Sequence, residues 1–257
     1  KTNSVTGSTT DWAQIPLENI EKIEITRGPV SALHGDTALA GVINIITSTG
    51  TESARKSLLV EGGSFKTLRE SAAASGKIKE LSYSVMIPGE NSDGYRDNSA
   101  YTGRNATLKL GYDLSKAATL SFKAGYHDDD RERAGALTKD EMLLYGRRGT
   151  SSEGDEADIE QTNFDVGLDF RTERSGTFSL FLSRSDDTND STITYGTGSV
   201  ISDDESAVNQ LTLKHILTLH PWRMDSTLAW GADLGWEEAD ASTLNDFPGW
   251  VTDQKID

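Results

Sequence analysis

From residue 54 onward the chain is a succession of segments in which every second residue is apolar. In one of them Phe164, Val166, Leu168 and Phe170 alternate with Asp165, Gly167 and Asp169. Successive side chains of a β-strand point to opposite faces, so each segment predicts a strand with one apolar and one polar face. The pattern predicts nine strands, near residues 54–63, 66–76, 80–90, 99–113, 118–128, 159–171, 177–187, 206–219 and 225–238.

The connections between these segments alternate in length. Short connections are expected at 76–79, 113–117, 172–176 and 220–224, and long ones at 91–98, 129–158 and 188–205. Only the first hairpin, at Ser64 and Phe65, departs from the alternation. Short turns at one end and long loops at the other are typical of an outer-membrane β-barrel, whereas a soluble sandwich with Greek-key crossings need not segregate its loops.

Before residue 54, two runs of β-branched residues flank a stretch with glycine and proline, which permit tight turns. The ordered series comprises Ile15-Pro16-Leu17, the run IEITRGP at 23–29, Ser31-Ala32-Leu33 followed by Gly35, and GVINIIT at 41–47. This series resembles the closing part of the plug domain of TonB-dependent outer-membrane receptors. Two positions depart from the family pattern: His34 stands where an aromatic is frequent, and Ala40-Gly41 where two glycines are frequent. The segment DGYRDNSAY at 93–101 also resembles the second outer loop and fourth strand of such receptors.

The resemblance implies an all-β fold with two parts. Residues 1–50 would be the C-terminal part of the plug domain, and residues 51–257 the N-terminal part of an antiparallel transmembrane barrel. The complete barrel is expected to have 22 strands and a plugged lumen. The chain would then be a fragment, because about nine strands leave two open edges in lipid.

The resemblance also implies a function and partners. We expect energised uptake of a scarce nutrient chelate across the bacterial outer membrane, with a ferric siderophore as first choice and haem or a cobalamin as further candidates. Energy would come from the TonB complex through an N-terminal region that these residues do not include, and a signal peptide is likewise not present in the sequence. Outer-membrane lipid is the other expected partner.

Composition limits the alternatives. The formal net charge is -16, with 41 acidic against 25 basic residues, which argues against nucleic acid as a partner. The chain has no cysteine, so disulfides and thiolate metal sites are excluded. No nucleophile–base pair or metal-ligand spacing is present, since the histidines are scattered, and the chain is not expected to be an enzyme.

One basic residue of the plug-like stretch is a candidate anchor. A buried arginine needs a carboxylate partner, because an uncompensated charge inside a protein is costly. In plugs that resemble this one, the arginine matching Arg27 pairs with glutamates on the barrel wall, so Arg27 is expected to join plug to wall. Glu24 is the alternative partner, within the plug itself.

The acidic clusters allow two interpretations. Asp128, Asp129 and Asp130 end the fifth predicted strand, and Asp186 and Asp187 end the seventh. They are either solvated surface charge or ligands for calcium, a hard cation that prefers several carboxylate or carbonyl oxygens. No other cofactor is expected.

Three further expectations follow from local patterns. A short helix is expected within 136–146, with Thr138 as N-cap. Tyr126, Trp230 and Trp236 are expected in the interfacial aromatic girdles of the barrel. The rival to the barrel is a soluble, acidic, calcium-dependent β-sheet binding or adhesion domain, in which the face opposite the apolar one would pack as core; in this chain that face is polar, with Asp165, Asp169 and Ser179.

Overall fold

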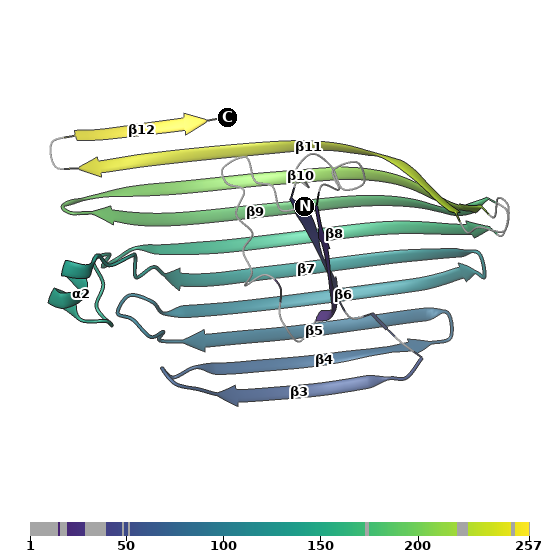
Figure 1. Ribbon diagram of the computed structural model, residues 1–257, viewed down its shortest axis with the longest axis horizontal. Helices are drawn as coiled ribbons and strands as arrows, with labels where there is room; N and C mark the ends of the chain where they lie inside the picture. The colour runs from purple at the N-terminus through teal and green to yellow at the C-terminus, as the bar shows by residue number, and fades with distance from the viewer. Residues whose placement is uncertain are drawn as a thin grey trace.

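The computed structural model describes most of the chain. The residues described are 15, 20–28, 40–47, 49–50, 52–172, 175–219, 226–247 and 250–256. They form two separate sheets, one small and one large (Figure 1).

The small sheet is an antiparallel pair built from the plug-like stretch. β1 (Ile20–Arg27) pairs with β2 (Gly41–Thr47), and Ile23 lies opposite Ile45 and Ile25 opposite Ile43. β-branched residues favour this pleated arrangement. At the open end Gly28 continues the pairing, and its backbone N–H donates to the carbonyl of Ala40 at 3.0 Å. Both β-branched runs of the sequence are therefore strands of one hairpin.

The large sheet is antiparallel, and its strands follow one another in chain order (Figure 1). Its ten described strands are β3 (Arg55–Gly62), β4 (Leu68–Ile78), β5 (Leu81–Ser92), β6 (Tyr101–Ser115), β7 (Ala118–Glu132), β8 (Glu156–Thr172), β9 (Gly176–Tyr195), β10 (Gly198–Leu219), β11 (Ser226–Phe247) and β12 (Trp250–Ile256). A meander of this kind, in which each strand pairs only with its sequence neighbours, is the wall of an up-and-down barrel.

The nine predicted strands are confirmed as β3 to β11, but several of their bounds were wrong. The long loop expected at 188–205 does not exist: β9 and β10 continue to Tyr195 and Gly198 and are joined by a tight turn, with Gly196 at a φ of +61°. The loop expected at 129–158 is confined to residues 133–155. The expected alternation of loop lengths failed there because most residues of these strand ends are polar on both faces, so apolar residues no longer recur at every second position while the pairing continues. β12 was not predicted.

The two faces of the large sheet differ in character. One row of directly paired residues crosses five strands and is apolar throughout, namely Phe122, Val166, Leu182, Leu211 and Leu234. The residues next to them along the strands, such as Ser121, Asp165 and Ser183, lie on the other face. Phe164, Val166, Leu168 and Phe170 are all exposed, as are Leu182 and Leu234. We call this set of exposed apolar rows the apolar belt; an exposed apolar surface that crosses five neighbouring strands is suited to lipid.

The interior of a soluble domain is absent from the described residues. Among the hydrophobic side chains whose exposure the structure gives, only Met86 and Ala157 are buried. The described helix is α2 (Lys139–Tyr145), which is too short to span a bilayer, and no described helix has the length and apolarity that crossing a membrane requires. Burial of apolar surface in this fold therefore depends on what contacts the apolar belt from outside.

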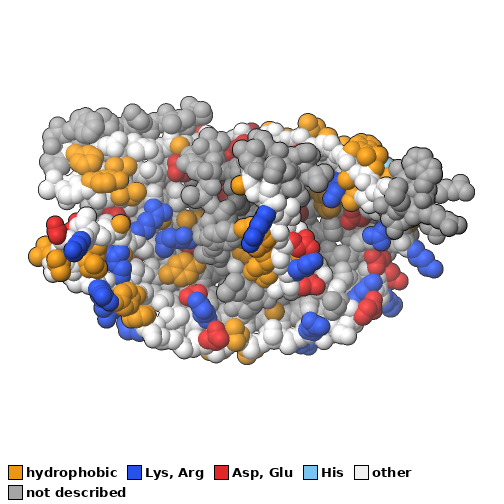
Figure 2. Space-filling model, viewed as in Figure 1, with side chains coloured by type: hydrophobic (Ala, Val, Ile, Leu, Met, Phe, Trp, Pro, Cys, Tyr) orange, Lys and Arg blue, Asp and Glu red, His pale blue; other side chains and the backbone are white. Residues whose placement is uncertain are grey.

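The small sheet lies against the polar face of the large one. Lys109 of β6 is on that face, opposite Lys123 of β7, and its ammonium donates to the backbone oxygen of Thr47 at 2.9 Å. Figure 2 views the molecule in the same orientation as Figure 1 and shows Lys, Arg, Asp and Glu side chains distributed over this side. The plug-like hairpin is thus on the side that becomes the lumen when the sheet closes. The boundary expected near residue 50 falls between the two sheets and stays a prediction.

Candidate functional site

The plug-like hairpin places its two candidate anchor residues apart. Arg27 ends β1 opposite Gly41, and its side chain is exposed, with no carboxylate partner among the residues that the structure describes. Glu24 lies three positions earlier and therefore on the opposite face of the strand. The pairing of Arg27 with glutamates of the barrel stays a prediction.

Glu24 has partners within its own hairpin. Its carboxylate accepts hydrogen bonds from Lys22, two residues away, and from the side-chain amide of Asn44 on β2 at 3.2 Å. The hydrogen bond from Lys22, aided by that from Asn44, holds the pKa of Glu24 below its usual value. Glu24 therefore stabilises the pairing of β1 with β2 and is not held by Arg27.

Sequence reasoning missed the contact that does join the two sheets. The Lys109 ammonium donates to both the backbone and the hydroxyl oxygen of Thr47, the last residue of β2. Its cross-strand neighbour Lys123 is paired with Asp165 at 3.2 Å. The available signal was a pair of lysines on the face predicted to line the lumen, since two like charges in register need acceptors from elsewhere.

The predicted calcium residues divide between the two faces of the sheet. Asp128, Asp130 and Asp186 continue the outward, apolar-belt face beyond its last apolar row, whereas Asp129 and Asp187 point to the lumen side. Asp186 is bound by Arg184 of its own strand. Within the described ranges, no three His, Asp or Glu side chains are arranged to hold a metal ion. Calcium binding stays a prediction, and a shared site would need groups beyond these five carboxylates.

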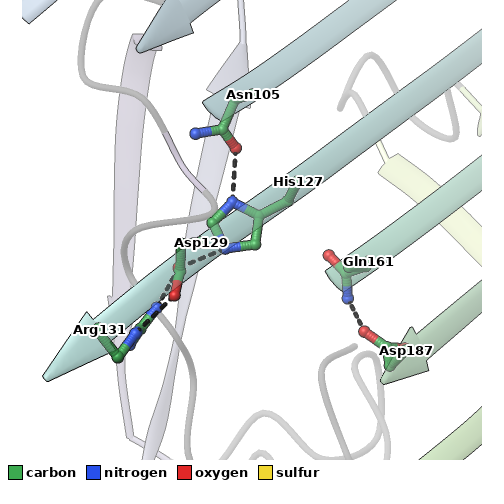
Figure 3. Close-up of polar contacts among 6 residues, drawn as sticks. All are labelled: Asn105, His127, Asp129, Arg131, Gln161 and Asp187. Carbon is green, nitrogen blue, oxygen red and sulfur yellow. Dashed lines mark hydrogen bonds and ion pairs between the residues drawn. The ribbon is translucent and has the colours of Figure 1, made fainter. Parts of the chain in front are cut away.

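A polar network lines the lumen side above the level of the apolar belt (Figure 3). The ring of His127 lies between Asn105, at 2.9 Å from Nδ1, and the carboxylate of Asp129, at 2.7 Å from Nε2. Arg131 also donates to Asp129, from Nε at 2.7 Å. His127 and Asp129 are only 3% and 1% exposed. Burial alone would raise the pKa of Asp129, but the hydrogen bonds from His127 and Arg131 outweigh it, and the pKa is lowered.

The β3–β4 turn, the β5–β6 loop and the β7–β8 loop lie at one end of the large sheet and contact one another. Arg148, in the loop between β7 and β8, lies over the rings of Phe65 and Tyr95, at 5.6 and 5.8 Å from their centroids. Phe65 belongs to the β3–β4 turn and Tyr95 to the β5–β6 loop, and their rings meet edge to face at 5.5 Å. A guanidinium close to two aromatic rings adds cation–π attraction to the contact. The loops of this end are therefore one assembly.

The predicted helix is confirmed within this assembly. α2 begins after Thr138, whose hydroxyl accepts from the backbone N–H of Glu141, while the Glu141 carboxylate accepts from the backbone of Thr138 at 2.8 Å. This reciprocal pair is a capping box, and it lowers the pKa of Glu141. Hydrophobic side chains gather over α2 at the left of Figure 2, and Leu143 and Leu144 are among the most exposed apolar residues described.

The aromatic residues expected at the interfaces lie on the outward face. Trp230 lies beside His215, which stacks on Phe178 with the ring centroids 3.9 Å apart, close to the short-turn end of the sheet. Trp236 and Tyr126 are exposed on the same face at the loop end of the apolar belt. His34 and His220 fall outside the described residues.

Comparisons with known proteins agree with this geometry. Residues 1–42 match the family model of the TonB-dependent receptor plug domain. The vitamin B12 transporter BtuB of Photobacterium profundum is 28% identical over 138 residues, which are 50% of this chain and 23% of that protein. The iron-regulated outer membrane virulence protein of Vibrio cholerae is 32% identical over 154 residues, 54% of this chain and 22% of that protein. The chain spans less than a third of the length of these relatives.

The fold is also that of solved receptors. The ferric yersiniabactin uptake receptor FyuA of Yersinia pestis superposes with a TM-score of 0.77 at 17% identity, covering 91% of this chain and 38% of that one. The plug-domain match at residues 1–42, the named relatives and the receptor-like fold together support a TonB-dependent receptor of the outer membrane, with the end of a plug followed by part of a barrel.

Proposed function

We propose that the complete protein takes up a scarce nutrient chelate across the outer membrane, with a ferric siderophore as its substrate and the TonB complex as its source of energy. The observation that carries this proposal is the plug-family hairpin, which lies against the polar face of a sheet whose outward face is apolar. A wall with that outward face needs lipid, and a hairpin on its inward side obstructs any pore the wall encloses. Passage through such a protein requires the plug to move, and this movement is the step to which we assign the energy of the TonB complex.

Iron is proposed as the cargo because of the names that relatives bear. An iron-regulated outer membrane virulence protein and a ferric enterobactin receptor, PirA of Pseudomonas aeruginosa, match at 32% and 30% identity. The vitamin B12 transporter at 28% identity keeps a cobalamin as the second candidate. An adhesin built on a soluble sheet has no support from these relatives and is not carried further.

The proposal is tested by uptake in cells. A strain lacking the gene is compared with its parent for accumulation of radioactive iron from a panel of ferric siderophores and from haem, and of labelled cobalamin. The expected result is the loss of uptake for at least one ferric siderophore, and the same loss in a parent strain without TonB. Unchanged iron uptake together with lost cobalamin uptake would mean that the substrate is a cobalamin and not a ferric siderophore. Unchanged uptake of every ferric siderophore, of haem and of cobalamin would overturn the proposed function.

A further inference from the structure

The β5–β6 loop inserts two side chains into the base of the β7–β8 loop, residues 133–155. The Arg96 guanidinium donates to the backbone oxygen of Gly149 from both Nε, at 3.2 Å, and Nη2, at 2.9 Å. It also donates to the carbonyls of Ala134, at 3.0 Å, and of Gly135. A single planar guanidinium thus satisfies carbonyls on both arms of the loop, a geometry that its fixed fork of donors allows and a lysine cannot reproduce.

Asn98 makes the second insertion, two residues further on. Its side-chain NH₂ faces the backbone oxygens of Ser152 at 2.8 Å, Asp155 at 2.9 Å and Arg133 at 3.1 Å. The backbone of Asn98 is in the left-handed region, with a φ of +55°, which asparagine tolerates better than most residues. Arg96 and Asn98, which we call the loop clamp, therefore hold six carbonyls of one long loop from a different loop.

The clamped loop also contacts the β9–β10 hairpin. Asp155, which is 5% exposed, accepts hydrogen bonds at 2.6 Å from the backbone and the hydroxyl of Thr194 near the end of β9. The same Asp155 offers its backbone oxygen to Asn98. The clamp thereby fixes the β7–β8 loop between the β5–β6 loop on one side and the β9–β10 hairpin on the other.

The loop carries the most exposed apolar group outside the apolar belt. Met142, Leu143, Leu144 and Tyr145 of α2 are all exposed, and α2 lies at the loop end of the sheet (Figure 1). Other contacts also hold this loop of more than twenty residues: the backbone bonds from Arg133 to Asp155 and from Asp97 to Arg148, and the bonds from Thr194 to Asp155. The clamp adds the side-chain bonds that join the two arms of the loop at its base. Ordering a loop before its ligand arrives removes part of the entropic cost of binding.

We propose that Arg96 and Asn98 are positioning residues for ligand capture: they hold the β7–β8 loop, with α2, in one arrangement at the extracellular mouth. The identity of the ligand rests on the proposed function. The clamp itself rests only on the hydrogen bonds of Arg96 and Asn98. Neither side chain needs to touch the ligand.

The test uses the full-length receptor in the outer membrane, with hydrogen exchange of residues 136–149 and binding of ferric siderophores as readouts. Asn98→Asp keeps the size and backbone preference but removes the donor, and Arg96→Lys keeps the charge but removes the fork. Each substitution removes hydrogen bonds to the loop and is expected to speed hydrogen exchange of the loop and to weaken ligand binding by about tenfold. Arg96→Lys is expected to have the smaller effect. Exchange of β7 and β8 is expected to stay unchanged, which shows that the barrel has folded.

Lys66→Ala is the matched control. Lys66 pairs with Asp93 at 2.6 Å in the adjoining turn, where both side chains are exposed, so its loss is expected to change neither readout. Unchanged loop exchange in both clamp variants would overturn the clamp, and faster exchange with unchanged affinity would overturn its role in capture. Failure of the wild-type receptor to bind any chelate would instead overturn the proposed function, so the two failures are distinguishable.

Discussion

The same strands pass through two regions with different outward surfaces. Along β8 the outward residues are Phe170, Leu168, Val166 and Phe164 and then, after Thr162, Glu160 and Asp158. The pairing with β7 and β9 continues without interruption across this change. The backbone pairing is therefore the same on both sides of the boundary. Only the character of the outward side chains indicates whether lipid or water surrounds the wall.

Beyond the apolar belt the outward face is strongly acidic. Asp130, Asp158, Asp190 and Asp203 are directly paired across four neighbouring strands, on the loop side of the apolar row that contains Phe122, Val166 and Leu182. Like charges directly opposite one another destabilise a sheet. A surface of this kind suits water and not hydrocarbon, so the strands continue well beyond the membrane on the side of the long loops.

The largest effect is expected from a charge placed in the apolar belt. Leu168→Arg should destabilise the full-length receptor by about 2–4 kcal/mol, because arginine at membrane depth on the lipid face is costly. Glu160→Arg, on the same face of the same strand, should change stability by about 1 kcal/mol or less. Denaturant unfolding of both variants in lipid vesicles measures the difference. Equal losses of stability in the two variants would mean that Leu168 and Glu160 face the same medium, and would contradict the boundary between lipid and water.

A second effect contrasts the two faces above the belt. Asp129→Ala should destabilise by about 2–3 kcal/mol, because it leaves the buried His127 and part of Arg131 without their acceptor. Asp130→Ala removes an exposed carboxylate from the outward acidic row and should be neutral or slightly stabilising. The same unfolding assay decides, and a larger loss for Asp130→Ala would reverse the assignment of the faces.

The smallest effect is a dependence on pH. Partial burial, and then the neighbouring Asp130, raise the pKa of Asp158, and partial burial and Asp203 do the same for Asp190. An acid whose pKa is raised by folding binds more protons in the folded state, so stability should fall as pH rises from about 4 through the folded pKa and then stay level. Asp158→Asn should flatten this fall and stabilise the receptor slightly at pH 7. The effect should be less than about 1 kcal/mol because both carboxylates, although partly shielded by their neighbours, remain largely exposed to solvent. A steeper fall of stability with pH in Asp158→Asn would exclude charge repulsion along the row of outward aspartates.

The sequence predicted the apolar belt well and the region above it poorly, for one physical reason. Within the belt the two faces differ in hydropathy, so the period of two is visible and β3 to β11 were found. Above it apolar residues no longer recur at every second position: Asp190 points outward and Asn189 inward, and neither is apolar. The continuation of β9 and β10 was therefore predicted as a loop, although Thr192, Ile193 and Val200 carried a β propensity that could have indicated it.

The site residues show a related limit. Arg27 and Glu24 were selected from a local motif, whereas the contact between the sheets comes from Lys109, sixty-two positions after Thr47 in the chain. Arg96 and Asn98 lie within the recognised segment 93–101, yet their role depends on carbonyls of a loop that begins at residue 133. A single sequence contains the capping box of α2, which is local, but does not contain such partners, which are fixed only when the strands pair.

The most direct test of the membrane assignment is a scan of single cysteines along β8 with a spin label, because these 257 residues contain no cysteine of their own. Labels at Leu168, Asp165 and Glu160 in the full-length receptor, reconstituted in lipid, are compared for collision with oxygen, which concentrates in lipid, and with a water-soluble nickel complex. A lipid-facing belt predicts high oxygen and low nickel accessibility at 168, and the reverse at 160, with 165 protected from lipid. Nickel accessibility at 168 equal to that at 160 would contradict a lipid-facing belt and with it the barrel.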